Sequence, residues 1–412
     1  MRVEIPYLRD SVPVELPEGS LVVEPNDVEA AADPAGLVRE AVERPLGAEP
    51  LSDFLGAGGK VLVIVNDATR PTPTRTVLDA IGDSLDRPGV SFIVATGAHR
   101  APTEDEYRQI LGPHYGRLRP RVSAHAARDD ASLVSLGATR NGTPILLNKA
   151  AFEADRILVT GSVEPHYFAG YTGGRKAFLP GIAGYATIEA NHKLALSPRA
   201  VSLALDDNPV SQDMEDALRL IEKPVFSIMT VLDKHQRLVA CRAGGIRQSF
   251  AAAVELANGI FAVRMPEKAD IVLSVARFPM DIDLYQSQKA IDNGALALAE
   301  GGILIMVSSC RDGVGDQAFL ELLGSSSDPA QALERIGQGY RLGYHKAAKI
   351  ASVASRASIR AVSELDEATL RKAFIRKERS IPDALRDAIA EKGPDARIAV
   401  LLDGTVTVPL VK

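Results

Sequence analysis

The sequence predicts an α/β protein of two domains, each with a largely parallel sheet, and three observations support that prediction. The chain has 412 residues, which is too long for one ordinary hydrophobic core. Its apolar runs, such as residues 60–66, are short and continuous, as in strands that are buried on both faces. A loop and then a helical pattern follow such runs, which is the order expected of a parallel sheet with helices on both faces.

Composition and charge exclude several classes of protein. Hydrophobic residues make up 46% and charged residues 24%, which is typical of a soluble globular chain. The net charge is −6 and the cations are scattered, which argues against a nucleic-acid partner. No apolar run approaches the ~18 residues of a membrane span, and the charged first twenty residues do not form a signal peptide. The two cysteines, Cys241 and Cys310, are far apart, so we expect a reducing, cytoplasmic location and no cysteine metal site.

The first domain is expected to cover residues 1–265. Short alternating segments within residues 1–24, separated by prolines, predict edge strands that lead into this domain. Residues 33–45 predict a helix, with Asp33 as its N-cap and Pro34 at its first position. Further strands are expected at residues 60–66, 90–95 and 156–160, and further helices at residues 77–85 and from the capping box at residues 103–106.

The second domain is expected to cover residues 266–412, because a helical pattern gives way to polar residues near 255–268. Its strands are expected at residues 270–275, 302–307, 359–362 and 397–402. Its helices are expected at residues 285–300, 329–336, 367–377 and 382–392. Residues 403–408 predict a hairpin turn into a final strand, for which a return to the first domain is left open.

Polar side chains follow three of the predicted strands. Asp67 and Arg70 follow the first strand, His99 the second and His166 the third. Ligands of open parallel sheets bind outside the carboxyl ends of the strands, so we expect these side chains at one edge. Arginine can grip a carboxylate or phosphate through its planar fork. The local alternatives are that Asp67 or Thr72 caps a helix and that the histidines are solvated or simply packed.

Residues 161–194 combine six glycines with His166, Lys176 and His192. Glycines let a backbone approach a ligand closely or adopt positive φ, so this composition predicts a ligand site. Lys176 follows two glycines, as in a phosphate-binding loop, but the spacing is not GxxxxGK[ST]. No GxGxxG follows a strand either, which argues against a nicotinamide dinucleotide. His192 lies on a predicted helix, where the alternative is ordinary packing.

Residues 283–289 begin a predicted helix whose first two turns carry Tyr285, Gln286 and Lys289. The spacing places Tyr285 and Lys289 four residues apart and Gln286 and Lys289 three apart, on one helix face. A lysine and a glutamine at a helix N-terminus can anchor a small anion. The alternative is a solvated face without a ligand.

Taken together, these motifs resemble those of the nickel-pincer lactate racemase family, whose members isomerise 2-hydroxy acids. The resemblance covers most of the chain and rests on DATRPTP at 67–73, TGAHR at 96–100, EPHYFAGYTGGRKAFLPGIAG at 164–184, NHKL at 191–194 and DLYQSQK at 283–289. It implies that the active site lies in the cleft between the two domains.

The resemblance also implies a cofactor, a pyridinium-3-thioamide-5-thiocarboxylic acid mononucleotide that carries Ni(II). Lys176 matches the lysine that holds this group covalently, and His192 matches the histidine that binds the nickel. Square-planar nickel suits sulfur and imidazole ligands. The family's cofactor loop matches Asp67, Ala68, Thr69 and Arg70.

His99 and His166 match the two acid–base histidines of that family. One imidazole per enantiomer would take the hydroxyl proton while the cofactor accepts the hydride, giving a planar 2-keto acid. Hydride return to the other face inverts the stereocentre. The substrate carboxylate must stay fixed while the rest of the acid rotates. The resemblance implies that the substrate-binding residues are Arg70, Tyr285, Gln286 and Lys289.

The resemblance leaves the identity of the 2-hydroxy acid open, because the chain has no Trp where some family members place one near the substrate. The expected partners are this small acid and the host enzymes that mature the cofactor. The oligomeric state is left open, with a homodimer as one possibility. Rival interpretations are a nicotinamide-linked dehydrogenase, a phosphate-binding transferase that uses Lys176, and a nickel or cofactor carrier without turnover.

Overall fold

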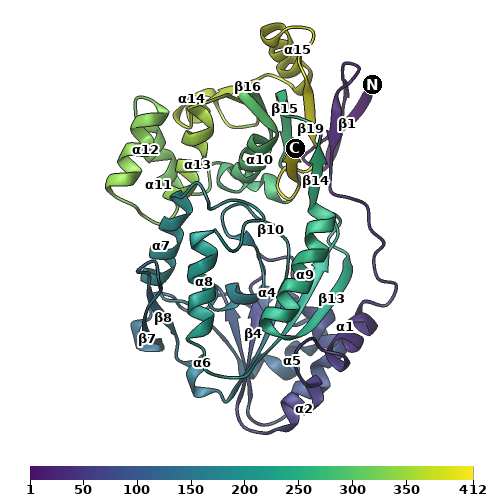
Figure 1. Ribbon diagram of the computed structural model, residues 1–412, viewed down its shortest axis with the longest axis vertical. Coiled ribbons are helices and arrows are strands. Elements are labelled where there is room, and N and C mark those ends of the chain that lie inside the picture. The colour runs from purple at the N-terminus through teal and green to yellow at the C-terminus, as the bar shows by residue number, and fades with distance from the viewer. Residues whose placement is uncertain (412) are drawn as a thin grey trace. The chain divides into compact units, whose positions relative to one another are not determined.

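The computed structural model describes residues 1–411 and divides the chain into two compact units (Figure 1). Unit 1 consists of Met1–Asn26 and Phe261–Lys412, and unit 2 consists of Asp27–Ile260. Two α/β units are therefore confirmed. The prediction of a single boundary after residue 265 is wrong for the first 26 residues, which belong with the C-terminal half. Among residues 1–411, no helix has the length and apolarity needed to cross a membrane.

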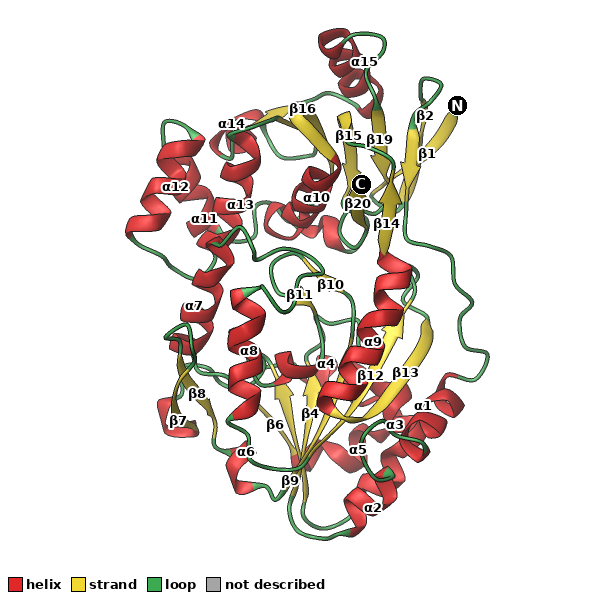
Figure 2. Cartoon of the chain, viewed as in Figure 1, coloured by secondary structure: helices red, strands yellow, loops and turns green. Residues whose placement is uncertain are grey.

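Unit 2 is built on a six-stranded sheet in the order β13-β12-β9-β4-β5-β6 (Figure 2). All neighbouring strands are parallel except β12 and β13, which are antiparallel. The strands are β4 (Val61–Asn66), β5 (Val90–Ala95), β6 (Val122–Ala124), β9 (Arg156–Ser162), β12 (Val225–Leu232) and β13 (Leu238–Gly245). The three strands that the sequence predicts here are confirmed as β4, β5 and β9.

Two short antiparallel pairs complete the β-structure of unit 2, namely β7 (Leu133–Ala138) with β8 (Pro144–Asn148), and β10 (Pro165–His166) with β11 (Gly170–Tyr171). The helices are α1 (Pro34–Glu43), α2 (Leu51–Gly56), α3 (Thr74–Ile81), α4 (Glu104–Leu111), α5 (Tyr115–Leu118), α6 (Ala150–Glu153), α7 (Tyr185–Lys193), α8 (Pro209–Arg219) and α9 (Ile246–Phe261). The helix starts follow the predicted capping chemistry. Asp33 accepts from the backbone N–H of Gly36 at 2.8 Å, and Thr103 forms a complete capping box with Glu106.

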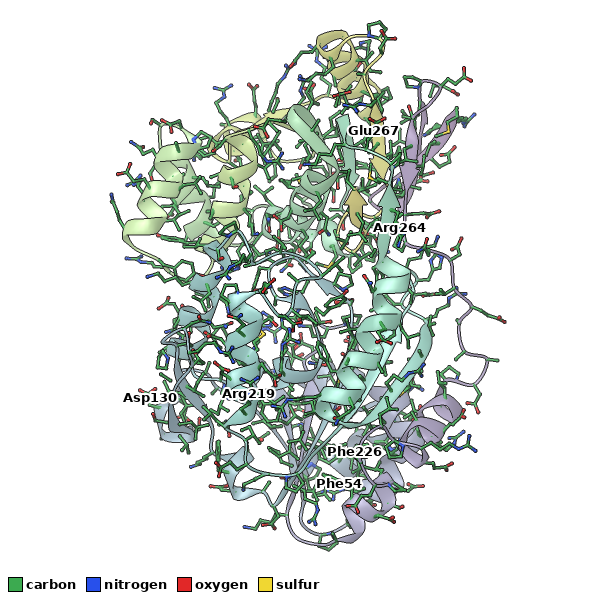
Figure 3. The ribbon with its side chains drawn as sticks, in the orientation of Figure 1. Phe54, Asp130, Arg219, Phe226, Arg264 and Glu267 are labelled. Carbon is green, nitrogen blue, oxygen red and sulfur yellow. The ribbon has the colours of Figure 1, made fainter. Side chains whose placement is uncertain are left out.

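The sheet of unit 2 is buried on both faces, as its continuous apolar strands predict. Val63 and Ile64 point to opposite faces of β4 and are 0% and 1% exposed. One face packs against helices α1 to α5. There the ring of Phe54 from α2 lies 5.4 Å from the ring of Phe226 from β12 (Figure 3). This packing gives the strand ends a rigid base.

Unit 1 contains a second six-stranded sheet, entirely parallel, in the order β18-β17-β16-β15-β19-β3. Its strands are β3 (Leu21–Val23), β15 (Ala269–Val275), β16 (Leu298–Val307), β17 (Ser358–Val362), β18 (Ile375–Lys377) and β19 (Ile398–Leu401). Its helices are α10 (Leu284–Ala297), α11 (Gln317–Gly324), α12 (Pro329–Gln338), α13 (Tyr344–Ala354), α14 (Glu367–Lys372) and α15 (Ile381–Lys392). The four strands expected here are confirmed as β15, β16, β17 and β19.

The N-terminal segment was predicted to lead into the first domain, and that prediction is wrong. β1 (Arg2–Tyr7) and β2 (Asp10–Glu15) form an antiparallel hairpin, and β3 pairs with β19 as the edge strand of the unit 1 sheet. Ile5 and Val14 of the hairpin are buried in the same core as the strands β15, β16 and β19. Burial of these apolar side chains explains why the segment belongs to unit 1.

Two further predictions for unit 1 are corrected. The final strand β20 (Val408–Val411) does not form a hairpin with β19. It pairs in parallel with β14 (Ala262–Met265), which lies within the range 1–265 left open for its return but belongs to unit 1. The helix predicted over residues 367–377 ends at Lys372, and Phe374 has a φ of 60° before the chain enters β18. Because positive φ interrupts a right-handed helix, the last residues of that range become a strand.

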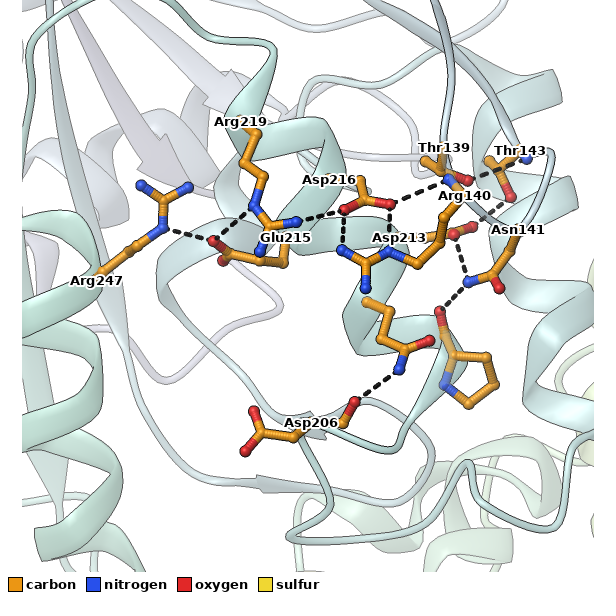
Figure 4. A network of polar contacts seen from close by, with 12 residues as sticks. Thr139, Arg140, Asn141, Thr143, Asp206, Asp213, Glu215, Asp216, Arg219 and Arg247 are labelled. Atoms are coloured by element: carbon orange, nitrogen blue, oxygen red, sulfur yellow. Dashed lines mark hydrogen bonds and ion pairs between the residues drawn. The ribbon is translucent and has the colours of Figure 1, made fainter.

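A polar network attaches the β7–β8 turn to helix α8 (Figure 4). The carboxylate of Asp213 is 0% exposed and accepts hydrogen bonds from the Asn141 amide at 2.9 Å and from the Thr143 hydroxyl. On the outer side, Arg140 pairs with Asp216 at 2.6 Å. The buried half of the network fixes α8, against which part of the glycine-rich segment rests.

Replacing Asp213 by alanine is expected to lower the free energy of unfolding by about 1–3 kcal/mol, because the buried Thr143 hydroxyl and the Asn141 amide lose their acceptor. The measurement is urea denaturation of the variant and the natural chain. Glu215→Ala, on the same helix, removes a pair with the exposed Arg247 and should cost less than about 1 kcal/mol. Equal losses in the two variants would contradict this account of the network.

Candidate active site

The strands that carry the predicted polar residues are direct neighbours in the sheet. β4 pairs in parallel with β5 on one side and with β9 on the other. The loops after these strands therefore leave the sheet at the same edge. Asp67 and Arg70 belong to the first loop, His99 to the second, and His166 to the third. The expectation that they share one edge is met by the topology.

The first contact across this edge joins Asp67 to His99. The Asp67 Oδ2 atom lies 2.8 Å from the His99 Nδ1 atom, and Oδ1 accepts from the Thr69 backbone N–H at 3.1 Å and the Thr69 hydroxyl at 2.6 Å. Burial alone raises the pKa of Asp67, but the hydrogen bonds from His99 and Thr69 and the charge of Arg70 outweigh it, so the pKa lies below its ordinary value. A carboxylate can only accept, so Nδ1 carries a proton, and in the neutral form of the ring the lone pair lies on Nε2 of His99.

The alternative role of the Asp67 loop as a helix cap is not observed. Helix α3 begins at Thr74 after Pro73 and has no side-chain N-cap. Thr72 instead ties β4 to β9, since its hydroxyl donates to Asn66 Oδ1 at 2.8 Å and accepts from the Ser162 N–H at 3.1 Å. The sequence predicts Thr72 only as a possible cap, because nothing local to the chain indicates this bridge.

The glycine-rich segment gathers Lys176, His166 and His192 around the ring of Phe168. The Lys176 Nζ atom lies 5.7 Å from the centre of that ring, the His166 ring 4.6 Å and the His192 ring 5.0 Å. Lys176 lies in a single 3-10 turn, Gly174–Ala177, and His192 lies on α7. Gly173 has a φ of 81°, which a residue with a side chain would adopt only with strain.

The electrostatics of His192 connect this group to the Asp67 loop. Burial, together with the charges of Lys176 and Arg70, lowers the pKa of His192 to about 3, against a backbone hydrogen bond with Ile188 that raises it. The imidazole is therefore neutral at pH 7. The charge of Arg70 contributes to the lowered pKa of His192. The loop after β4, which carries Arg70, therefore lies near the part of α7 that carries His192.

Arg175, for which the sequence predicts no role, fixes the backbone next to Lys176. Its side chain is 3% exposed and donates to the Ala169 carbonyl at 3.2 Å and to the Ser211 hydroxyl of α8 at 3.0 Å. The guanidinium also lies 4.7 Å from the Phe250 ring centre. Burial lowers the pKa of Arg175 to about 10, so it stays charged at neutral pH. The segment that carries Lys176 is thus held by a buried cation.

The predicted substrate residues of unit 1 lie together at the start of α10. Asp283 caps this helix and accepts from the Gln286 N–H at 2.6 Å. The Tyr285 ring stacks edge-on against Phe319 at 5.6 Å, and the Lys346 Nζ atom lies 4.0 Å from the centre of the Tyr285 ring. Lys289 follows one turn later. Burial raises the pKa of Asp283, and the nearby charge of Lys289 opposes that rise. The shared helix face is therefore observed within unit 1.

Two family models match this chain. The model of the lactate racemase N-terminal domain matches residues 7–202, and the model of the lactate racemase C-terminal domain matches residues 265–408. The chain belongs to the lactate racemase family. As a member of that family it is an isomerase of the racemase type, which confirms the resemblance seen in its motifs.

Curated lactate racemases of two bacteria are similar to this racemase-family chain. That of Thermoanaerobacterium thermosaccharolyticum is 30% identical over 344 residues, which cover 81% of this chain and 80% of the relative. That of Lactiplantibacillus plantarum is 28% identical over 418 residues, which cover 98% of each. The match extends over both units.

Solved structures support the same fold. The lactate racemase apoprotein of Thermoanaerobacterium thermosaccharolyticum aligns with a TM-score of 0.93 at 27% identity over all of both chains. A protein of Thermotoga maritima aligns with a TM-score of 0.70 over 93% of this chain and all of its own. At 17% identity, that second likeness shows the fold alone. In the described part of this racemase-family chain, residues 1–411, no three His, Cys, Asp or Glu side chains form a metal-binding group.

Proposed function

We propose that this isomerase interconverts the enantiomers of a small 2-hydroxy acid, lactate or a related short-chain acid. The observations that support the proposal are the grouping of Lys176, His166 and His192 around Phe168 and the Asp67–His99 pair after the neighbouring strands. The relatives named lactate racemase favour the same substrate class.

The residues present fit a tethered nickel-pincer nucleotide. A covalent link needs an amine, which Lys176 offers, and a metal needs an unprotonated ligand, which the neutral imidazole of His192 offers at pH 7. Both side chains lie against the ring of Phe168. We therefore propose that Lys176 holds the nucleotide, that His192 binds its nickel, and that Asp67, Ala68, Thr69 and Arg70 line its other parts. When bound, the cofactor would supply the acceptor for the hydrogen on the substrate's α-carbon.

The chain's own task in this reaction is to move the proton of the substrate hydroxyl. Asp67 holds the proton of neutral His99 on Nδ1, so Nε2 can accept one. At His166 the arrangement differs, because Nδ1 accepts from the Ala169 N–H at 3.3 Å, so this ring must exchange that bond for a proton on Nδ1 before Nε2 can take part in proton transfer. We propose that the two histidines act on opposite enantiomers: the neutral ring of one accepts the hydroxyl proton, and the other ring, charged before the step, returns a proton to the new hydroxyl and becomes neutral.

The substrate carboxylate needs a fixed cationic partner while the rest of the acid reorients. We propose Arg70 for this role, together with Tyr285, Gln286 and Lys289 at the start of α10. A planar guanidinium binds carboxylate in a defined orientation, whereas an ammonium acts as a point charge. Lys176 is not available for this task if it carries the cofactor. A cytoplasmic location and a dependence on cofactor-maturation enzymes of the host are parts of the same proposal.

The test is intact-protein mass spectrometry of the chain produced together with cofactor-maturation enzymes. We expect an added mass on the natural chain, located by peptide mapping at Lys176, and none on Lys176→Arg, because the guanidinium is not a nucleophile at neutral pH. Lys193→Arg, on the exposed side of α7, is the matched control and should keep the added mass. An unmodified natural chain that still racemises would contradict the tether, and a modified chain without turnover of any 2-hydroxy acid would point to a carrier.

A further inference from the structure

His125 is a buried histidine outside the group described above. It follows β6 directly, is 2% exposed, and makes contacts through both ring nitrogens. The Nε2 atom lies 2.9 Å from the Ala183 carbonyl oxygen, and the Nδ1 atom lies 3.1 Å from the Asn148 Nδ2 atom. Its backbone continues the sheet, with its N–H donating to the Val94 carbonyl of β5 at 3.1 Å.

The hydrogen bonds of His125 specify one tautomer. Asn148 Oδ1 accepts from the Ala150 N–H at 3.0 Å, so the amide nitrogen of Asn148 faces His125 and can only donate. The Ala183 carbonyl can only accept. The ring must therefore carry its proton on Nε2 and keep its Nδ1 lone pair, which is the neutral form. Burial favours the same form, since it lowers the pKa of His125 against the opposing hydrogen bond to Ala183.

His125 also bonds the loop that carries His99. The Thr96 hydroxyl donates to the His125 carbonyl at 2.7 Å, and the His99 N–H donates to the Thr96 carbonyl at 2.9 Å. The next residue, Gly97, donates its N–H to the Gly181 carbonyl at 2.9 Å. The turn that presents His99 is thus fastened to the same segment that His125 holds through Ala183.

The segment 181–184 lies between Lys176 and His192, the two residues proposed to hold the cofactor. Upstream, the Gly181 N–H donates to the Lys176 carbonyl at 3.0 Å. Downstream, Tyr185 begins α7, the helix that carries His192. The segment is paired with β8, where the Asn148 N–H donates to the Ile182 carbonyl at 2.9 Å. Among the hydrogen bonds described for residues 1–411, the bond from His125 to Ala183 is the one that joins a histidine side chain to this segment.

The geometry points to His125 as a positioning residue. Its neutral imidazole and its backbone carbonyl fix the turn that carries His99 relative to the segment between Lys176 and His192. This inference rests on the proposed function for the roles of those three residues. His125 touches neither substrate nor cofactor in this account. It acts by fixing the separation of groups that must be placed within a fraction of an ångström, where a 1 Å error can cost about 10²-fold in rate.

The tautomer can be measured on the natural chain without any variant. In ¹⁵N-histidine-labelled protein, long-range ¹H–¹⁵N spectra distinguish Nε2–H from Nδ1–H and from the charged ring. We expect one histidine to be neutral with its proton on Nε2 at pH 7, and its signal to disappear in His125→Gln. A charged ring or an Nδ1–H tautomer at His125 would overturn the inference.

The functional test uses His125→Leu and His125→Gln, with the rate expressed per molecule that carries the mass on Lys176. Leucine removes both ring bonds, so we expect kcat to fall about 10- to 100-fold with little change in KM. Glutamine keeps a donor for Ala183 and should restore most of kcat. Amide exchange at Gly97, Asn148 and Gly181 should quicken in the leucine variant only.

The matched control is His114→Leu, because His114 also bonds through both ring nitrogens, to Asp79 at 2.9 Å and Arg117 at 3.0 Å. It should leave kcat unchanged. If His125→Leu folds and keeps the natural kcat and exchange rates, or if glutamine fails to restore kcat, His125 has no positioning role. If the natural chain shows no added mass on Lys176, the proposed function is wrong. The tautomer measurement then still tests the inference about His125 by itself.

Discussion

His166→Ala is expected to lower racemisation by about 10²- to 10⁴-fold while the added mass on Lys176 remains, because the variant lacks one of two proton-transfer groups. The two histidines would serve opposite enantiomers, so the losses need not be symmetrical. In a single turnover, one enantiomer should still give the 2-keto acid in His166→Ala, and the opposite enantiomer should do so in His99→Ala. Acid quenching followed by chiral chromatography measures both.

His114→Ala controls for the general effect of removing a partly buried histidine, and it should keep full activity. If either site variant retains the natural rate for both enantiomers, the assignment of two acid–base histidines is wrong. If the His166 variant loses the mass on Lys176, the residue supports the cofactor through Phe168 rather than moving protons. The mass measurement therefore separates a chemical role from a structural one.

Much of the site could be predicted from the sequence, because the topology of a parallel sheet is simple. A continuous apolar run such as residues 61–66 can be buried only between two layers, and the loops after parallel strands leave at one edge. Polar residues after three such runs therefore had to converge if the strands were neighbours. The sheet order β9-β4-β5 supplies that condition.

The parts that were not predicted depend on pairings between distant segments. Nothing local to residues 21–23 indicates that they pair with β19 near the other end of the chain, nor that β20 pairs with β14. The sequence assigns no role to His125 for the same reason, since its ring bonds Ala183, 58 residues away. Its position directly after β6 becomes a signal only once that short strand, which the sequence does not predict, is known.

Asp67→Asn is expected to reduce turnover by about 10²-fold or more, even though it changes only one atom of the side chain. In the natural chain the Oδ1 atom accepts two hydrogen bonds from Thr69, and Oδ2 faces His99 Nδ1. An asparagine would keep its oxygen toward those two donors and present its NH₂ group to His99. The ring would then carry its proton on Nε2, where it can no longer accept one, and a comparable tautomer error costs serine proteases about 10⁴-fold.

The pH dependence tests the same pair with a defined sign. The pKa of Asp67 is lowered from 3.8 in the folded chain, so the stability from its charged form is present above the unfolded pKa and is lost as the pH falls through the lower folded value. Between pH 5 and 8 the carboxylate is charged, and raising the pH should not rescue Asp67→Asn. Asp79→Asn, which alters the surface pair with His114, is the matched control and should be fully active. A natural rate in Asp67→Asn with the mass on Lys176 intact would show that the tautomer of His99 does not depend on this carboxylate.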